Sequence, residues 1–373
     1  MSTTPSYADE LTLALRAVHA ASILTKDVLR SLSNSVSHES HAKNEPVTIA
    51  DFAAQALLTS ALHAVYPSDR FVGEESASAL RSDDGLAERV WELVQRAGAA
   101  LRAVSGAMQE TRPLSVPSSK EKMLSCIDAG AGDQSTAEGR IWVMDPVDGT
   151  LSFMHNRQYA VCLCLLVDGV QTVGVIGAPN LKIDTQGKLG DRIHEDLVDE
   201  DGYGVLLSAV RGKGTYVRSM HADSLGPPRH ISPSQHTTRS KTNLDFVETT
   251  VGKTSLCQDD HKAVADLLGS PWPGTVLWSQ QAKYVALTLG TTDVMLRIPK
   301  DTERFTHIWD HAGGQLLFQE TGGIIKDFDG KDIDFRHGRK IVGTRNFGML
   351  AARPDVFDDV MEAVKRVLGR RTA

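Results

Sequence analysis

Two aspartates three residues apart are the first residues in this sequence that could do chemistry. They lie in Asp145-Pro146-Val147-Asp148-Gly149-Thr150, directly after an apolar run that predicts a strand over 141–144. Carboxylates at this spacing can converge on one point, and the Val147 carbonyl between them is free to face it. Mg²⁺ prefers such an all-oxygen ligand set. Because Asp-Gly and Pro are turn formers, an ordinary tight turn is the alternative explanation.

Acidic residues also stand beside two other expected elements. Glu74 and Glu75 follow a short predicted strand, and taken alone they are typical of a solvated acidic turn. Asp51 precedes a helix predicted over 52–65. Thr48 and Asp51 have the spacing of a capping box, so helix capping is the alternative explanation for Asp51.

The last acidic position is Asp310, which follows Trp309 and precedes a helix predicted to end at Glu320. Its alternative role is again that of an N-cap residue. The small residues Ala312-Gly313-Gly314 would let this helix approach the site closely.

The secondary structure predicted around these carboxylates changes along the chain from helical to β-rich and then to alternating strands and helices. Helical spacing predicts a helix over 11–32, and a β-rich region follows from residue 140 to residue 217. After the linker signal Gly226-Pro227-Pro228, strands and helices alternate. We therefore expect two domains, 1–227 and 228–373, with the site between them, where clefts commonly form.

The overall composition excludes several classes of protein. The chain has 373 residues, of which 41% are hydrophobic and 23% charged, as in ordinary globular proteins. The net charge of -7 disfavours a broad nucleic-acid-binding surface. No apolar run approaches the ~18 residues of a membrane span, and the start lacks a secretory pattern. The four cysteines form no CxxC pair. We expect a soluble, cytoplasmic monomer without nucleic-acid or membrane partners.

The order and the residue sequences of these acidic motifs resemble those of the lithium-sensitive, magnesium-dependent phosphomonoesterases. That superfamily includes inositol monophosphatases, fructose bisphosphatases and 3′(2′),5′-bisphosphate nucleotidases. Nearly the whole chain is similar to the fungal nucleotidases. The long connection between Glu74 and Asp145 is also typical of them. The segments that carry this closer similarity are Pro46-Val47-Thr48, Ala53-Ala54-Gln55, Val72-Gly73-Glu74-Glu75-Ser76, Ala160-Val161-Cys162-Leu163, Gly177-Ala178-Pro179-Asn180-Leu181, Gln281-Ala282-Lys283-Tyr284 and Trp309-Asp310-His311-Ala312.

The resemblance implies a fold, a cofactor and residue roles. The fold would be α/β (α+β), the layered α-β-α-β-α sandwich of the inositol monophosphatase and fructose bisphosphatase type. Thr150, hydrogen-bonded to Asp51, would take the proton of the attacking water. Two or three Mg²⁺ ions would be held by Glu74, Asp145, the Val147 carbonyl, Asp148 and Asp310. The substrate would be bound by Gly149, Thr150, Gln280, Lys283, Arg297 and Asp310.

The reaction that the resemblance implies is removal of the 3′-phosphate of adenosine 3′,5′-bisphosphate. Its products would be AMP and phosphate, and 3′-phosphoadenylyl sulfate and the 2′,5′-bisphosphate would also be substrates. Such a reaction would belong to sulfate assimilation and would be inhibited by Li⁺. Two alternatives are an inositol phosphate phosphatase and a non-catalytic nucleotide-binding sensor.

Two departures from the fungal pattern concern the nucleotide. Gln280 occupies the position of a serine, and the loop from Gly252 to Cys257 lacks a histidine that helps hold the base in the relatives. His261 lies too far along the chain to replace it. The metal chemistry should survive both changes.

Overall fold

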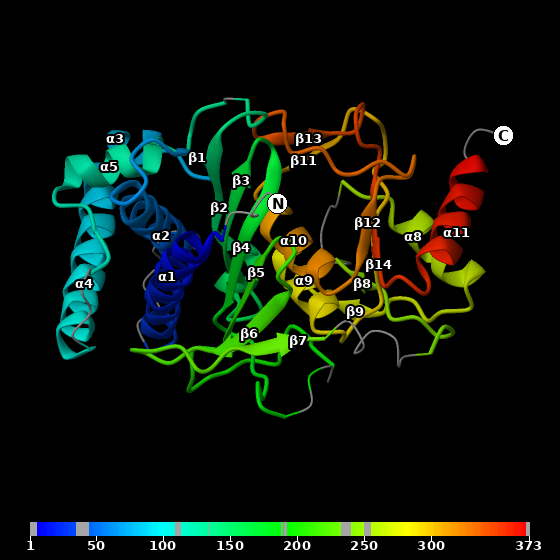
Figure 1. Cartoon of the computed structure of the whole chain (residues 1–373), viewed down its shortest axis with the longest axis horizontal. Coiled ribbons are helices and arrows are strands. Elements are labelled where there is room, and N and C mark those ends of the chain that lie inside the picture. Colours follow the sequence, from blue (N-terminus) through cyan, green and yellow to red (C-terminus); the bar gives the residue numbers. More distant parts are fainter. Residues whose placement is uncertain are drawn as a thin grey trace.

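The computed structural model of the chain describes residues 6–34, 45–108, 113–133, 135–187, 189, 192–232, 240–249 and 255–370 (Figure 1). The helices are α1 (Ala8–Asn34), α2 (Glu45–His63), α3 (Ser78–Ser82), α4 (Asp84–Met108), α5 (Lys120–Asp128), α6 (Thr150–Met154), α8 (Gln258–Leu267), α9 (Gln280–Thr288), α10 (Ala312–Glu320) and α11 (Phe357–Gly369). The strands are β1 (Arg70–Gly73), β2 (Arg140–Asp148), β3 (Ala160–Val167), β4 (Val170–Ala178), β5 (Val205–Val210), β6 (Thr215–Ser219), β7 (Arg229–Ile231), β8 (Val247–Glu248), β9 (Thr275–Val276), β10 (Val294–Arg297), β11 (Phe305–His307), β12 (Ile324–Lys326), β13 (Lys340–Val342) and β14 (Met349–Ala352).

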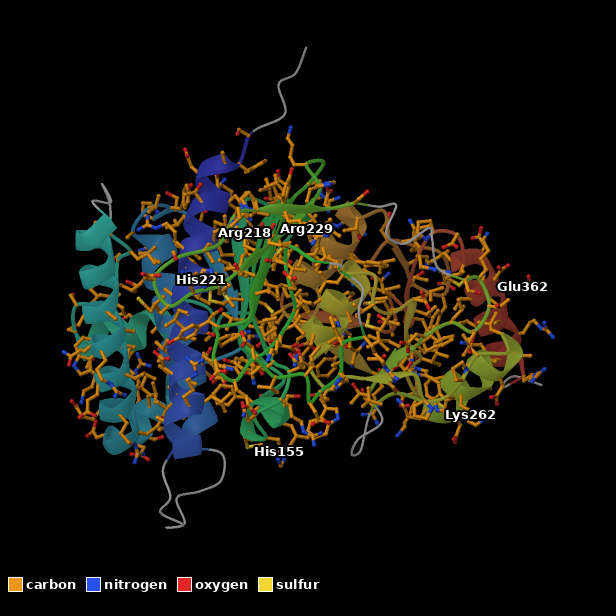
Figure 2. All side chains as sticks on the ribbon, turned by 90° about the horizontal axis from the view of Figure 1, so that it is seen from below. His155, Arg218, His221, Arg229, Lys262 and Glu362 are labelled. Atoms are coloured by element: carbon orange, nitrogen blue, oxygen red, sulfur yellow. The ribbon has the colours of Figure 1, made fainter. Side chains whose placement is uncertain are left out.

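Helices and sheets alternate in layers along the long axis of the molecule (Figure 1). Helices α1 and α2 cover one face of a large sheet, with α4 outside them, and α10 packs on the other face beside α9. A second sheet, in the order β10-β14-β12, follows, and α8 and α11 close the stack. Figure 2 shows Lys262 of α8 and Glu362 of α11 on this outer surface. The predicted α-β-α-β-α sandwich is confirmed.

The large sheet has seven strands in sequence order, from β1 to β7. β1 and β2 are parallel, and every later neighbour is antiparallel. In the register of the parallel pair, Gly73 lies opposite Met144. Because parallel strands end at the same edge of a sheet, the residues that follow, Glu74 and Asp145, emerge side by side.

The central strands of this sheet are apolar on both faces because helices cover both faces. β3 reads AVCLCLLV, and every residue before its last is buried. Cys162 and Cys164 are 2% and 1% exposed and are therefore small core side chains. Among the helices that the structure describes, none is both long and apolar enough to cross a membrane.

The structure confirms the helices and strands that were predicted from long periodic segments. The helix predicted over 11–32 is α1. Within the predicted β-rich region the apolar run 170–178 predicts a strand, and β4 has these bounds. In the region of alternating strands and helices the spacing over 356–368 predicts a helix, which is α11. The short strands β11, β12 and β13 were not predicted, because three residues are too few to show an alternating pattern.

Candidate active site

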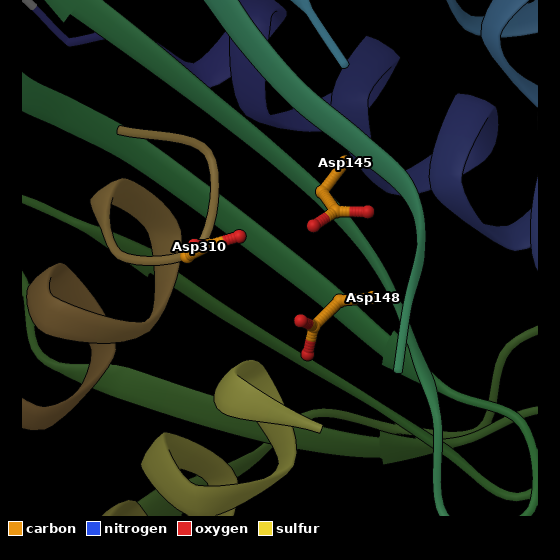
Figure 3. A group of neighbouring side chains, drawn as sticks. All are labelled: Asp145, Asp148 and Asp310. Atoms are coloured by element: carbon orange, nitrogen blue, oxygen red, sulfur yellow. The ribbon is translucent and has the colours of Figure 1, made fainter. Parts of the chain in front are cut away.

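Three aspartates from distant parts of the sequence face one another in the space between β2 and α10 (Figure 3). Asp145 and Asp148 belong to β2, and Asp310 lies just before α10. One carboxylate oxygen from each lies within 4.8 Å of the other two. The structure therefore brings together three of the predicted metal ligands.

The Asp145–Asp148 segment belongs to the strand itself, so the alternative of a turn after the strand is wrong. β2 runs to Asp148, and its pairing with β3 shifts between Asp145, opposite Cys162, and Asp148, opposite Ala160. Three steps on β2 thus match two steps on β3, which defines a β-bulge. A bulge leaves one residue out of the ladder and re-aims its neighbours. This irregularity turns two carboxylates of one strand toward a single point.

Asp148 is held by the start of helix α9. Its Oδ2 accepts hydrogen bonds from the Ser279 hydroxyl and from the Gln281 amide at 2.6 Å, and the Gln280 amide lies 3.3 Å from Oδ1. Burial and then Asp310 raise the pKa of Asp148 to about 6, although the bonds from Ser279 and Gln281 act in the opposite direction. Residues far apart in the sequence therefore fix this carboxylate.

Asp145 lacks such support. Asp145 is 2% exposed, and its Oδ1 has no hydrogen-bond partner among the described residues. Burial, and then the neighbouring carboxylates of Glu74, Asp148, Asp310 and Asp51, raise its pKa well above the usual range. Burying a carboxylate oxygen without a hydrogen-bond donor costs free energy. A cation bound at this atom would supply the missing partner.

Glu74 lies at the rim beside Asp145. The residue as a whole is exposed, but protein atoms crowd its carboxyl group. This burial of the carboxyl group, followed by the charge of Glu75, raises the pKa of Glu74 to about 7, while a hydrogen bond with Asp145 acts against the increase. Gln55 of α2 fixes the segment, because its amide group donates to the Glu75 carbonyl and accepts from the Glu75 amide.

Asp51 is not a helix cap, and the capping box with Thr48 is wrong. α2 begins at Glu45, since a proline such as Pro46 is tolerated in a first helical turn, so Asp51 lies inside the helix. It is 5% exposed, and burial followed by Glu75 and Glu74 raises its pKa well above the usual range. Its Oδ1 has no hydrogen-bond partner in the described part of the chain, so a bond from Thr150 to this atom is not formed.

Gly149 and Thr150 form the start of α6. Gly149 has φ 91°, and a Cβ atom added there would lie 2.7 Å from Ser279 Cβ. Both facts require glycine, because the left-handed conformation is unfavourable for other residues. Thr150 is exposed and directly follows Gly149, two residues after Asp148.

Asp310 is not an N-cap residue either. The N-cap of α10 is His311, and Asp310 precedes it in a turn. The Thr306 hydroxyl lies 3.2 Å from Asp310 Oδ2 and 2.8 Å from His311 Nε2. His311 is fully buried, and burial followed by the nearby cations Arg297 and Lys283 lowers its pKa well below the usual range.

The residues expected to bind substrate lie on the α9 and β10 side. Lys283 is 5% exposed, and burial followed by Arg297 lowers its pKa to about 8, although Asp148 and Asp310 act in the opposite direction. Arg297 donates to Gln280 Oε1 at 2.5 Å and to Thr306 at 3.3 Å. In this structure Gln280 therefore orients Arg297. A hollow beside Arg297 and Thr306 is also lined by Ser255, Phe305 and Asn346.

Sequence reasoning missed three residues that shape the site: Ser279, Thr306 and Gln55. Each is an uncharged polar residue. Ser279 and Gln55 contact a carboxylate or its loop across a large sequence separation, whereas Thr306 contacts Asp310 four residues on. Polar residues of this type are common everywhere in a sequence, so nothing in their spacing distinguishes them.

Other sequence features have ordinary roles. Gly212-Lys213-Gly214 is the turn of the β5–β6 hairpin, and its glycine amides donate to Glu320. His155 follows α6 and lies at the surface (Figure 2). His261 is buried against Glu248 at 2.9 Å and the Ile298 amide at 2.8 Å. Residues 252–254 of the altered loop lie outside the described residues.

The donor set fits a hard divalent cation. It consists of carboxylate oxygens from Asp145, Asp148 and Asp310, with Glu74 at the rim. Oxygen-only ligand sets select Mg²⁺, Ca²⁺ or Mn²⁺ over softer metals. The unpartnered Asp145 Oδ1 and the raised pKa values are the features that a bound cation would relieve.

Comparisons with known proteins identify the family of this chain. The sequence model of the inositol monophosphatase family matches residues 94–355, and the chain belongs to this family. A protein of Emericella nidulans named 3′(2′),5′-bisphosphate nucleotidase is 38% identical over 97% of this chain and 99% of its own length. Proteins of the same name from Schizosaccharomyces pombe and Oryza sativa are 36% and 33% identical, over 98% and 96% of this chain and 97% and 94% of their own lengths.

Solved structures share the fold at low sequence identity. Inositol monophosphatase II of Staphylococcus aureus superimposes with a TM-score of 0.58 and 16% identity, covering 95% of each chain. The inositol monophosphatase of Zymomonas mobilis gives a TM-score of 0.56 and 18% identity over 97% of this chain and the whole of the other.

Proposed function

We propose that this protein is a Mg²⁺-dependent phosphomonoesterase that removes the 3′-phosphate of adenosine 3′,5′-bisphosphate to give AMP and phosphate. The observation that supports it best is the Asp145, Asp148 and Asp310 cluster with Lys283 and Arg297 beside it. The names of the fungal and plant relatives support the nucleotide substrate. The same site would accept 3′-phosphoadenylyl sulfate and the 2′,5′-bisphosphate, which would connect the protein to sulfate assimilation.

The proposed ligands of two or three Mg²⁺ ions are Glu74, Asp145, the Val147 carbonyl, Asp148 and Asp310. Bound there, the metal would supply positive charge to the phosphate and lower the pKa of the attacking water. Free of metal, four carboxylates at this distance repel one another, which agrees with the raised pKa values of Asp145 and Glu74.

The remaining residues would orient the substrate and move a proton. Thr150 and Asp51 are proposed to accept the proton of the attacking water, since a hydroxyl beside a carboxylate can act as a relay. The Gly149 and Thr150 amides would bind the phosphate that is cleaved. Lys283 and Arg297 would bind the rest of the anionic substrate and attract it to a protein of net negative charge.

The main alternative is an inositol phosphate phosphatase, which the family membership and the solved relatives favour. The carboxylate cluster serves either substrate. A solved neighbour, a Staphylococcus aureus inositol monophosphatase II, is described as bound to 2′AMP (TM-score 0.55, 15% identity), and its fold thus holds a nucleotide in that protein.

The test compares phosphate release from adenosine 3′,5′-bisphosphate and from inositol 1-phosphate, with Mg²⁺ and with EDTA. We expect the nucleotide to be preferred and EDTA to abolish release. Asp145→Asn should be inactive, whereas Asp266→Asn, which changes an exposed aspartate paired with Lys262 on α8, should behave as the unmodified protein. Preference for inositol 1-phosphate would establish the alternative, and release from neither would favour a non-catalytic sensor.

A further inference from the structure

Behind Asp310 lies a chain of buried polar side chains that the proposed reaction does not use. Thr306 of β11 contacts both Asp310 and His311. His311 Nδ1 lies 2.8 Å from the Tyr284 hydroxyl, which lies 3.2 Å from Gln315 Nε2. We name Gln315, Tyr284, His311 and Thr306 the Asp310 relay. Tyr284, His311 and Gln315 are at most 1% exposed.

The available donors and acceptors assign one direction to these hydrogen bonds. An ionised Asp310 only accepts, so the single Thr306 hydrogen is donated to it. Arg297 only donates, so Thr306 accepts from it. His311 Nε2 must then carry a hydrogen and donate to the same oxygen, because two lone pairs would otherwise face each other at 2.8 Å.

The remaining contacts complete the same direction. The Tyr284 hydroxyl has two acceptors in reach, His311 Nδ1 at 2.8 Å and Met349 Sδ at 3.2 Å. Because a thioether sulfur is the weaker acceptor, a neutral His311 with hydrogen on Nε2 accepts at Nδ1 from this hydroxyl. The Tyr284 oxygen accepts in turn from Gln315 Nε2. Every hydrogen bond of the relay therefore donates toward Asp310, and hydrogen bonds in such chains polarise one another.

Thr306 also connects the proposed metal site to the proposed substrate-binding residues. Its oxygen receives Arg297 Nη2 at 3.3 Å, and Arg297 Nη1 donates to Gln280. The single hydroxyl thus contacts a proposed metal ligand and a proposed substrate-binding cation. Displacing it would move both groups, since residues that hold metal ligands fix their orientation and basicity.

We propose that Thr306, supported by His311 and Tyr284, is a positioning residue that fixes the orientation of Asp310 and couples the metal site to Arg297. The inference rests on the proposed metal site but not on the identity of the substrate. It predicts that Mg²⁺ affinity depends on a side chain that does not itself bind the metal.

The test is a Mg²⁺ titration without substrate of Thr306→Val, Thr306→Ser and the unmodified protein. The thermal unfolding midpoint, measured at each Mg²⁺ concentration, reports binding. Valine keeps the shape of threonine and removes the hydroxyl, whereas serine keeps the hydroxyl. We expect Thr306→Val to raise the half-saturating Mg²⁺ concentration by about 10- to 100-fold. Thr306→Ser should stay near the unmodified protein. Tyr284→Phe should shift the midpoint in the same direction but less, because it removes a more distant donor.

Activity provides a second measurement. At saturating Mg²⁺, Thr306→Val should raise KM for the phosphate substrate more than it lowers kcat, because Arg297 loses one of its two acceptors and keeps only Gln280. An unchanged Mg²⁺ midpoint in Thr306→Val would overturn the proposal, as would an equal shift in Thr306→Ser. If Thr306→Val does not fold in EDTA, an unchanged midpoint in Tyr284→Phe would overturn it instead. Because the titration contains no substrate, its result is independent of whether the proposed reaction is correct.

Discussion

The acidic site has two sides that differ in how the protein supports their charge. On the α9 and α10 side, Asp148 and Asp310 accept hydrogen bonds from Ser279, from helix amides and from Thr306. On the β1 and α2 side, Asp145 and Asp51 each keep a buried oxygen without a partner among the described residues.

This difference indicates a division of labour. Carboxylates that accept several hydrogen bonds are held in place whether or not a metal is present. Carboxylates without donors lack compensation for burial until a cation arrives. We infer that the supported side keeps the geometry of the site and that the unsupported side provides much of its affinity for cations.

The largest effects are expected when one aspartate on each side of the site is replaced by asparagine. Asp145→Asn and Asp148→Asn should each lower phosphatase activity by more than about 100-fold, beyond the loss typical of groups that only support metal ligands. Their effects on the free energy of unfolding in EDTA should have opposite signs. Asp145→Asn should stabilise the protein by about 1–3 kcal/mol, because it neutralises a buried carboxyl group that faces several carboxylates and has one oxygen without a partner among the described residues.

Asp148→Asn should destabilise the protein by a similar amount, because an amide NH₂ would face the Ser279 hydroxyl and the Gln281 amide. Urea unfolding in EDTA measures both values. If both substitutions change stability in the same direction, the proposed difference between the two sides is incorrect.

A smaller effect is expected from Ser279→Ala on the supported side. Ser279 donates to Asp148 and also caps α9, since its oxygen accepts from the Ala282 amide at 2.9 Å. Loss of the cap should cost about 1 kcal/mol of stability. Loss of the bond to Asp148 should also lower activity by roughly 10-fold.

Ser119→Ala is the matched control for the cap. Ser119 caps α5 through the Lys122 amide at 3.2 Å and touches no carboxylate of the site. It should cost similar stability, measured by urea unfolding, and leave activity unchanged. Equal activity in the two variants would mean that Ser279 acts only as a helix cap.

The last prediction concerns the dependence of stability on pH. Burial and charge repulsion raise the pKa of Asp148 to about 6 and that of Glu74 to about 7, above the values near 4 of unfolded chains. Between about pH 4 and pH 7 the folded state therefore binds more protons than the unfolded state, so stability in EDTA should fall as pH rises. The expected slope is about 1 kcal/mol per pH unit, close to the uptake of one proton.

Saturating Mg²⁺ should remove this slope, because the metal binds the deprotonated carboxylates. Asp145→Asn should reduce it, because one of the repelling charges is gone. Thermal unfolding at several pH values, with EDTA and with Mg²⁺, measures both changes. A stability in EDTA that rises over this pH range would show that the carboxylates are not under the inferred repulsion.

The sequence by itself was sufficient for the long elements and for the types of two of the proposed metal ligands. α1, β4 and α11 follow from hydrophobic periodicity, which depends on the local pattern alone. Two carboxylates three residues apart after a predicted strand identified Asp145 and Asp148 as candidates because hard cations require oxygen ligands, whereas the proposed roles of Glu74 and Asp310 followed from the resemblance. The layered fold followed from resemblance and is confirmed by the arrangement of the sheets and helices.

Tertiary structure decided how these residues are held. The bulge in β2, the place of Asp51 inside α2 and the bond from Ser279 to Asp148 all depend on partners far away in the sequence. Asp310 and Asp51 fit the pattern of helix caps locally, and that interpretation failed because cap geometry depends on where a helix begins in the folded chain. Periodicity reports which face of an element is buried, whereas the contacts of a short polar side chain are set by packing between elements.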